Sequence, residues 1–581
     1  MNIINNQTTK QPNNQTTNNL NNKILIYQVF TRLYGNRNTT RKEWGTLEEN
    51  GSGKFNDFTP QVLKDIKAMG ISHIWFTGVI RHATQTDYSE YGIPTQHPAV
   101  VKGRAGSPYA ICDYYDVDPD LAVDVKNRMK EFEALIARTH KAGMKVIMDF
   151  VPNHVARQYQ SIAKPKGVKD LGAEDNVNEG FNPQNNFYYC PGQRFDPYFD
   201  LRTSNGGLTT NLPPYVEEPA KSTGNDHFDA NPGINDWYET VKLNYGVDYW
   251  THYGHFDPIP DTWKKMTAIL QFWASKGVDG FRCDMAEMVP AAFWAWATDN
   301  VKFQHPDIIF IGEVYNPGEY RNYIAAGFDY LYDKVGMYDT MRNTICGHGS
   351  ASFITGAWQS TDDISQHMLY FLENHDEQRV ASDDFAGSAE RGIPGLVASV
   401  LMRENPFMLY AAEEYGERGM EKEGFSGKDG RTTIFDYWSI DTLCRAAEGQ
   451  LTAEEEHIYS IHQRVLQIAR KEKAVDGAFY DLMYANPWSA RFDNNKQFAF
   501  LRKKDGDILL VVCNFNGNAV NIDVKIPPHA VEFLEIPEKK YNATDLLTGD
   551  KKTINIKGGY SVDMDIPAYS ARIWKLSYRK K

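Results

Sequence analysis

Eight short apolar runs, separated by segments with helical periodicity, organise the sequence from Lys23 to Arg470. The runs are Ile24–Phe30, His73–Thr77, Lys145–Val151, Val278–Asp284, Asp307–Glu313, Phe328–Tyr332, Met368–Leu372 and Pro406–Tyr410. Helical spacing is clearest over Phe58–Met69, Asp124–Lys141, Trp263–Lys276 and Glu454–Arg470. Eight repeats of a strand followed by a helix predict an α/β fold, a parallel (β/α)8 or TIM barrel.

Two stretches interrupt or end this alternation. Residues 154–256 are rich in Asn, Gly, Pro and Tyr and have no sustained period, so we predict a subdomain inserted after the third strand. From residue 476 to 581 the pattern is all-β, and Phe498–Leu501 and Ile508–Val512 flank a Lys-Lys-Asp-Gly turn. The predicted parts are a disordered polar tail (1–22), two barrel segments (23–153 and 257–475), the inserted subdomain (154–256) and a C-terminal antiparallel β-sandwich domain (476–581).

Composition and charge narrow the expected partners. Lys and Arg number 62 against 75 Asp and Glu, a net charge of −13, so we expect no nucleic-acid partner. The chain has no run of about 18 apolar residues, so we expect no membrane span. The six cysteines lack C-x-x-C spacing, which disfavours a zinc site. Aromatic residues make up 13 % of the chain; most would be core, but ring faces also suit neutral sugars.

The first 22 residues bear on location. Met1–Asn22 is rich in Asn, Gln and Thr and has neither a charged first segment nor an apolar stretch, so it does not resemble a signal peptide. We therefore expect a cytoplasmic protein. An exported protein from which the signal had been removed would look the same.

Polar side chains follow several of the predicted strands at their carboxyl ends. They are Asp149, Asn153 and His154, then Arg282 and Asp284, then Glu313, then His375 and Asp376. In a (β/α)8 barrel these ends converge on one open face. Three acids that meet there, Asp284, Glu313 and Asp376, would destabilise the fold by repulsion and lost hydration. Such a set is what cleavage of a glycosidic bond requires.

Each residue also has a structural interpretation when taken alone. A buried Asp after a strand is often a helix N-cap or an ion-pair partner. Arg282 and Asp284 share one strand face, and an ordinary ion pair would have the same spacing. His154 and His375 could each be structural. Their joint occurrence at separate strand ends favours a catalytic site.

Four segments carry a family resemblance. Asp149–His154, Gly280–Asp284, Gly312–Tyr315 and Glu373–Asp376 resemble, in order, the four signature regions of the α-amylase family, glycoside hydrolase family 13. The resemblance extends over about Lys23–Arg470, the insertion resembles the family's B domain, and the β-rich tail resembles its C-terminal domain. It implies a retaining mechanism on α-linked glucans.

The resemblance implies roles for the acids and their neighbours. Asp284 matches the nucleophile, Glu313 the general acid/base, and Asp376 the carboxylate that binds sugar hydroxyls and stabilises the transition state. Arg282 would keep Asp284 ionised and oriented, because an adjacent cation lowers the pKa of a carboxyl. Asp149 matches an acid that organises the site.

It also implies which residues bind substrate. His154 and His375 match positions that hydrogen-bond the sugar in the cleavage subsite. Tyr109 resembles the aromatic platform beneath that sugar, with Tyr115 as the alternative match. Trp237 and Trp250 could each be a sugar platform or a packing residue.

Two features concern metal binding and the leaving-group side. Asn153 and Asp261 match positions that supply oxygen ligands to a structural Ca²⁺ in many members, so the resemblance predicts a Ca²⁺ site here. Ca²⁺ takes about six to eight oxygens, and two residues supply only a part of such a site. The chemistry itself requires no cofactor. Glu287 and Met288 stand where the family's amylases often have Lys-His, a pair that lines the leaving-group side.

The sequence therefore predicts a retaining hydrolase of α-1,4-glucosidic linkages in starch-type glucans or maltooligosaccharides. An α-glucan transglycosylase, a sucrose-type phosphorylase or an isomerase would carry the same three acids. A non-catalytic sugar-binding protein is a further alternative, but such relatives typically lose one or more of these acids, and all three are present here.

Overall fold

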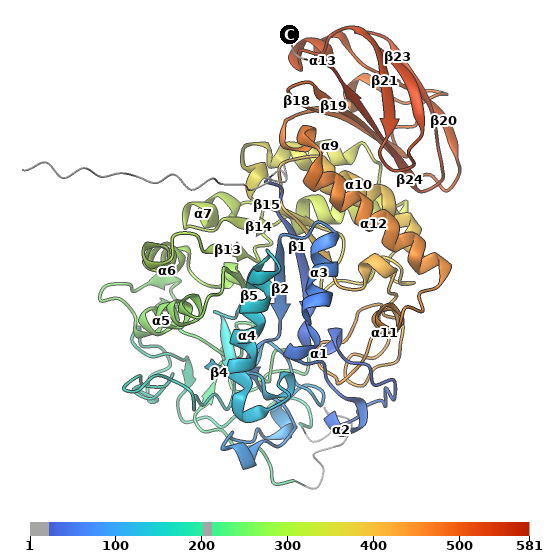
Figure 1. Ribbon diagram of the computed structural model, residues 1–581. Coiled ribbons are helices and arrows are strands. Elements are labelled where there is room, and N and C mark those ends of the chain that lie inside the picture. The colour runs from blue at the N-terminus through green and yellow to red at the C-terminus, as the bar shows by residue number, and fades with distance from the viewer. Residues whose placement is uncertain (1–21, 202–211, 580–581) are drawn as a thin grey trace, which may run out of the picture.

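The computed structural model describes residues 22–201 and 212–579, so nearly all of the predicted tail (1–22) lies outside the described residues. Eight parallel strands close into a barrel in the order β1-β2-β5-β12-β13-β14-β15-β16 (Figure 1). They are β1 (Leu25–Phe30), β2 (His73–Thr77), β5 (Lys145–Phe150), β12 (Gly280–Cys283), β13 (Ile309–Gly312), β14 (Tyr330–Tyr332), β15 (Met368–Phe371) and β16 (Phe407–Tyr410). Each coincides with a predicted run, which confirms the (β/α)8 barrel.

Helices surround the barrel, and side chains cap the start of two of the longer ones. The longer ones are α3 (Pro60–Ala68), α4 (Arg128–Lys141), α5 (Asp261–Ser275), α6 (Ala291–Gln304), α10 (Ile393–Leu401) and α12 (Ala453–Lys471). The shorter ones on the barrel are α1 (Thr31–Tyr34), α2 (Leu47–Asn50), α7 (Tyr320–Ala325), α8 (Asp339–Cys346), α9 (Phe353–Ser360) and α11 (Asp441–Glu448). The Thr59 side chain caps α3, with Pro60 in the first turn, and Thr452 and Glu455 form a capping box on α12.

An antiparallel ribbon between β2 and α4 was not predicted. It pairs β3 (Ile80–His82) with β4 (Ile111–Val117). All seven residues of β4 are buried, including Asp113 and Asp116, so the strand has no alternation of polar and apolar residues. The sequence therefore contains no alternating pattern from which β4 could be predicted.

The inserted region is held by very short strand pairs. They are β6 (His154–Ala156) with β9 (Thr240–Lys242), β7 (Tyr189–Cys190) with β8 (Ala220–Lys221), and β10 (Val247–Asp248) with β11 (Tyr253–Gly254). Strands this short leave no periodicity, as the sequence indicated. The proposed limits 154–256 remain a prediction, as do the other domain limits.

The C-terminal part is antiparallel, as predicted. One sheet has the order β17-β18-β19-β24-β21-β22, and β20 pairs with β23. The strands are β17 (Ala478–Asp481), β18 (Gln497–Lys504), β19 (Asp507–Asn514), β20 (Val520–Lys525), β21 (Lys539–Asp545), β22 (Lys551–Ile556), β23 (Ser561–Ile566) and β24 (Ser570–Ser577), with the short helix α13 (Pro528–Phe533) between β20 and β21. The predicted hairpin is β18–β19.

This C-terminal part packs on the amino end of the barrel strands. Arg502, which is fully buried, donates to the carbonyl of Met402, just before β16. Asp481 accepts hydrogen bonds from Thr355 and Trp358 of α9, which precedes β15. The inserted region lies at the opposite end of the barrel (Figure 1). The C-terminal part is therefore remote from the carboxyl ends of the strands.

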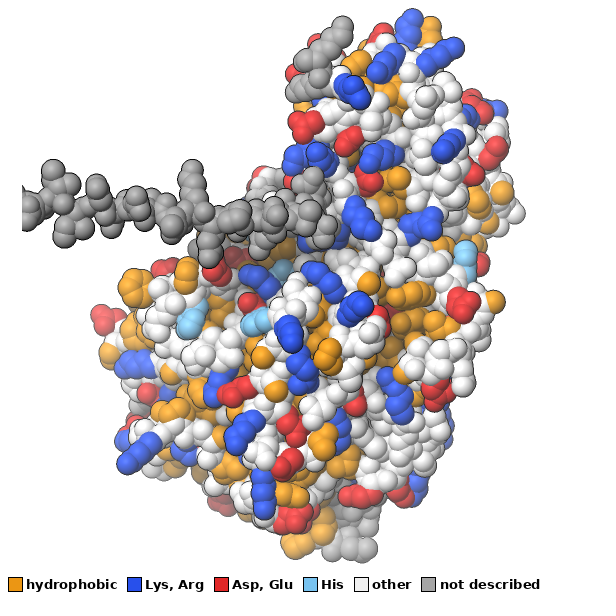
Figure 2. Space-filling model, viewed as in Figure 1, with side chains coloured by type: hydrophobic (Ala, Val, Ile, Leu, Met, Phe, Trp, Pro, Cys, Tyr) orange, Lys and Arg blue, Asp and Glu red, His pale blue; other side chains and the backbone are white. Residues whose placement is uncertain are grey.

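The surface carries both charge signs. Lys and Arg side chains are interspersed with Asp and Glu over the barrel and the C-terminal part on the face shown (Figure 2). The helices within residues 22–201 and 212–579 include none that combines the length and apolar character needed to cross a membrane.

Candidate active site

The barrel brings the three predicted acids to one cavity. Asp284 directly follows β12, Glu313 directly follows β13, and Asp376 lies in the loop after β15. All three line a cavity of about 230 Å³, together with Tyr109 and His154. Further lining residues are Lys102, Trp237, Met285, Tyr315, Ile434 and Phe435.

Arg282 connects the acids. Its side chain is fully buried, with Nη1 at 2.8 Å from Asp284 Oδ1 and Nη2 at 2.7 Å from Glu313 Oε2. Nη1 also lies 3.6 Å from Asp149 Oδ1, and Nε donates to the Tyr332 hydroxyl at 3.2 Å. One guanidinium therefore holds two carboxyls from adjacent strands with separate nitrogens, a geometry that a lysine could not supply.

Burial and charge act on these acids in opposite directions. Burial raises the pKa of Asp284 well above its ordinary value, the Arg282 guanidinium opposes that rise, and the Glu313 and Asp376 carboxyls add to it. Burial likewise raises the pKa of Asp149 to about 6, again against Arg282. Asp149 accepts from Trp75 Nε1 at 3.0 Å, which fixes its orientation at the end of β5.

Glu313 is held by two donors that the sequence analysis did not assign. The Met285 amide donates to Oε2 at 2.8 Å, and the Tyr315 hydroxyl donates to Oε1 at 2.6 Å. Met285 has φ of +43°, a left-handed conformation that is costly for a residue with a side chain and that aims its N–H at Glu313. Tyr315 lies within the motif Gly312–Tyr315 at the end of the fifth barrel strand, β13, but a loop has no period from which its direction could be predicted.

His375 links Asp376 to the cavity wall. Its Nε2 lies 3.2 Å from Asp376 Oδ2 and contacts the Tyr109 hydroxyl, and its Nδ1 lies 2.8 Å from the Gln28 amide nitrogen. Burial lowers the pKa of His375 to about 3, so the imidazole is neutral near pH 7. The Asp376 side chain is 39 % exposed, so its carboxylate is open to a bound molecule.

Of the two tyrosines proposed as a platform, the structure places Tyr109 in the cavity. Its ring stacks on His375, with centroids 5.4 Å apart and an interplanar angle of 28°. Tyr115 instead packs edge-on against Phe272 of α5, with ring centroids 5.1 Å apart. Tyr109 is therefore the tyrosine available to a ligand.

The inserted region contributes one wall of the cavity. His154 packs against the Trp237 ring at 5.2 Å, and both line the cavity. The pKa of His154 is lowered to about 3, first by burial and then by the nearby ammonium groups of Lys242 and Lys102. Trp250, by contrast, is 82 % exposed on the surface.

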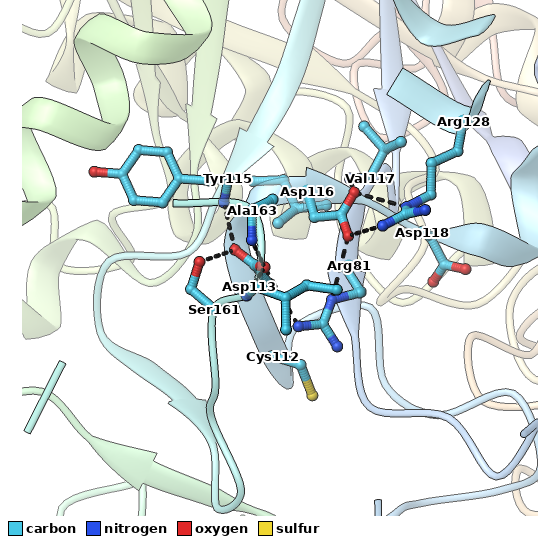
Figure 3. Close-up of polar contacts among 12 residues, drawn as sticks. Arg81, Cys112, Asp113, Tyr115, Asp116, Val117, Asp118, Arg128, Ser161 and Ala163 are labelled. Carbon is cyan, nitrogen blue, oxygen red and sulfur yellow. Dashed lines mark hydrogen bonds and ion pairs between the residues drawn. The ribbon is translucent and has the colours of Figure 1, made fainter. Parts of the chain in front are cut away.

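A buried ion-pair network fixes the ribbon that follows the Tyr109 loop (Figure 3). The Arg128 guanidinium binds Asp116 through two nitrogens at 2.8 and 2.7 Å, and Arg81 lies between Asp116 and Asp113 at 3.6 and 3.4 Å. Asp113 also accepts from the Ser161 hydroxyl at 2.6 Å. Because Ser161 belongs to the inserted region, this network ties that region to β4.

Glu287 and Met288 hold loops in place. Glu287 Oε2 accepts from the amides of Tyr315 and Asn316, both at 3.0 Å, and so caps the loop that follows Glu313. The Met288 carbonyl accepts from Lys242 Nζ at 3.2 Å. Among the described residues, the cavity lining includes neither Glu287 nor Met288.

The two residues predicted to bind Ca²⁺ each face a lysine. Asn153 Oδ1 accepts from the Lys242 ammonium, and Asp261 Oδ2 lies 2.9 Å from Lys265 Nζ. Within the described residues, no group of three or more His, Cys, Asp or Glu side chains could hold a metal ion. The two positions do not fit Ca²⁺, because an ammonium group already contacts the oxygen that would bind the ion.

Comparison with known proteins agrees with the motifs and the barrel. Residues 28–476 match the family model "Alpha amylase, catalytic domain", and residues 488–577 match "Alpha amylase, C-terminal all-beta domain". The chain is 25 % identical over 405 residues to Alpha-amylase MalA of Haloarcula japonica, a stretch that covers 68 % of this chain and 44 % of MalA. It is 23 % identical over 481 residues to Alpha-amylase 3 of Dictyoglomus thermophilum, covering 77 % and 82 %.

Among solved structures, the fold is similar to that of the maltogenic alpha-amylase AmyB from Thermotoga neapolitana. The TM-score is 0.61 at 19 % identity, and the match covers 96 % of this chain and 99 % of AmyB. The aligned part spans less than half of MalA, whereas it spans nearly all of AmyB. Since the catalytic-domain model matches most of the chain and the barrel carries the motifs in the same order, this protein belongs to the alpha-amylase family.

Proposed function

We propose that this protein is a retaining glycoside hydrolase that cleaves α-1,4-glucosidic linkages in starch-type glucans or maltooligosaccharides. One observation carries the proposal: a single buried guanidinium, Arg282, contacts both Asp284 and Glu313 at a cavity that Asp376 also lines. Buried acids gathered in this way oppose folding, and they are typical of sites that use perturbed carboxyls for chemistry.

The proposed reaction has two steps. Asp284 attacks the anomeric carbon while Glu313 gives its proton to the departing glycosidic oxygen, and a glycosyl ester forms on Asp284. Glu313, now a carboxylate, takes a proton from water as that water attacks the same carbon, and Asp284 leaves. Two inversions restore the original configuration. Arg282 favours the ionised form of Asp284, which is the form that attacks.

The cavity wall suits a neutral, polyhydroxylated ligand. His154 and His375 are neutral near pH 7 and present imidazole nitrogens beside the acids. Tyr109 and Trp237 offer ring faces that can cover the C–H groups of a sugar. Asp376, the most exposed of the three acids, would accept hydrogen bonds from sugar hydroxyls.

Maltoheptaose as substrate tests both the reaction and its stereochemistry. Shorter products whose newly formed reducing ends are first released as the α anomer, seen by proton NMR, would support retaining hydrolysis. Initial release of the β anomer would refute retention, and products longer than maltoheptaose would indicate a transglycosylase. Asp284→Asn should abolish turnover while sugar binding persists. Activity on starch that survives this substitution would show that Asp284 is not the nucleophile.

A further inference from the structure

Lys242 lies at the centre of a small oxygen cluster outside the catalytic cavity. Its ammonium contacts Asn153 Oδ1, lies 2.7 Å from Asp226 Oδ1 and donates to the Met288 carbonyl at 3.2 Å. Lys242 is 2 % exposed. The three oxygens come from the loop after β5, from the inserted region and from the segment after β12, so one side chain joins three separate parts of the chain.

The three oxygens are of the types that bind hard cations. They are one carboxylate, one amide and one backbone carbonyl, the ligand types of Ca²⁺ in proteins. Three oxygens are too few for Ca²⁺ alone, but they match the three N–H donors of an ammonium group. The single positive charge also faces a single carboxylate, that of Asp226. The cluster therefore suits an ammonium in number of bonds and in charge.

The backbone fixes Lys242 in this position. In the β6–β9 pair, Lys242 lies opposite His154, and its amide donates to the Ser222 carbonyl at 2.9 Å. The ammonium also lies 5.7 Å from the centroid of the Tyr249 ring, close enough for a cation–π contact. Because both the backbone and the ring limit its movement, the side chain is directed into the cluster.

A second lysine repeats the arrangement at the start of α5. Lys265 Nζ lies 2.9 Å from Asp261 Oδ2, from the Asp170 carbonyl and from Asn186 Oδ1. Asp170 and Asn186 belong to the inserted region, whereas Asp261 and Lys265 belong to the barrel helix α5. Two of the contacts between the inserted region and the barrel thus use a lysine where oxygens converge.

We propose that the Lys242 ammonium replaces a structural divalent cation between the inserted region and the barrel, so that this protein is stable without bound Ca²⁺. Through the Met288 carbonyl, Lys242 holds the segment that begins with Asp284, and through Asn153 it holds the loop that leads to His154. The internal cation therefore fixes one side of the catalytic cavity. This inference concerns stability and metal content and does not depend on the proposed reaction.

The first test uses the unmodified protein. Purified in buffers without added metal, it should contain far less than one equivalent of calcium by mass spectrometry of the elements. Its thermal unfolding midpoint should change by less than about 1 °C with excess EDTA or with millimolar CaCl₂, because a ligand that does not bind the native state cannot stabilise it. Stoichiometric calcium, or a midpoint that falls with EDTA and returns with Ca²⁺, would overturn the proposal.

The second test compares two Lys→Met variants from the same inserted region. Lys242→Met keeps a long unbranched side chain but leaves the Asp226 carboxylate and two further oxygens without their cation, so the midpoint should fall by about 3 °C or more. Lys169→Met, which breaks the exposed pair with Glu174, should change it by less than about 1 °C. Equal midpoints for the two variants would overturn the proposal. If Lys242→Met does not fold, the metal content and EDTA response of the unmodified protein decide whether the proposal holds.

Discussion

Replacing Arg282 by Lys keeps the positive charge but removes the fork that holds two carboxyls. At present Nη1 and Nη2 lie 2.8 Å from Asp284 and 2.7 Å from Glu313. A lysine side chain is shorter and has one nitrogen where arginine offers two, so it cannot keep both carboxyls at these distances. A charge-assisted hydrogen bond contributes about 1.5–3 kcal/mol, so kcat/KM on a maltooligosaccharide should fall about 10- to 150-fold.

The pH profile should shift as well. Arg282 opposes the rise in the pKa of Asp284 that burial produces, so a weaker contact lets that pKa rise further. Because the nucleophile acts when it is ionised, the acidic limb of kcat/KM should move to higher pH. Arg321→Lys, in the exposed pair with Asp363, serves as the control and should change neither quantity. If Arg282→Lys keeps kcat/KM within threefold and leaves the acidic limb in place, the role given to the guanidinium is wrong.

Three further predictions address other parts of the molecule. Tyr315→Phe removes the hydroxyl 2.6 Å from Glu313 Oε1 and should lower kcat about tenfold with little change in KM, whereas a rise in KM alone would contradict this role. Trp237→Ala removes a ring face from the cavity wall and should raise KM for maltooligosaccharides about tenfold; an unchanged KM would leave Trp237 as a packing residue. Burial raises the pKa of Glu413 from 4.5 to about 8. Between these two pH values the folded state thus keeps a proton that the unfolded state releases. The contribution of protonated Glu413 to the free energy of unfolding is complete below pH 4.5. It falls by about 1.4 kcal/mol per pH unit between 4.5 and 8 and is lost as the pH rises through 8. Glu413→Gln should therefore gain stability relative to the unmodified protein between pH 6 and pH 9 in urea unfolding, and a difference independent of pH would contradict the shift.

The barrel could be predicted from the sequence because parallel strands covered by helices are buried on both faces. Such strands are continuous apolar runs, as in Lys145–Phe150, which is buried except for its first residue. Helix starts were marked by Thr59 with Pro60 and by Thr452 with Glu455. The ribbon strand β4 could not be predicted, because Asp113 and Asp116 are buried through pairing with arginines outside the strand, 32 and 12 residues away.

For the candidate site, a residue at the end of a strand could be placed from the sequence, whereas a residue within a loop could not. Asp284 and Glu313 each follow a strand directly, so the topology alone places them at one face. The contact of Tyr315 with Glu313 depends on the conformation of a loop. Lys242 was missed because a lysine in a short strand is ordinarily exposed, and only the fold shows which oxygens surround it.

The assignment of Asp284 as the nucleophile can be tested most directly by trapping the covalent intermediate. A fluorinated maltosyl fluoride that reacts quickly and is hydrolysed slowly, followed by proteolysis and tandem mass spectrometry, locates the attached sugar. One glycosyl group is expected, on the side chain of Asp284. Attachment to Glu313 or Asp376, or consumption of the reagent with no sugar attached to the protein, would contradict it.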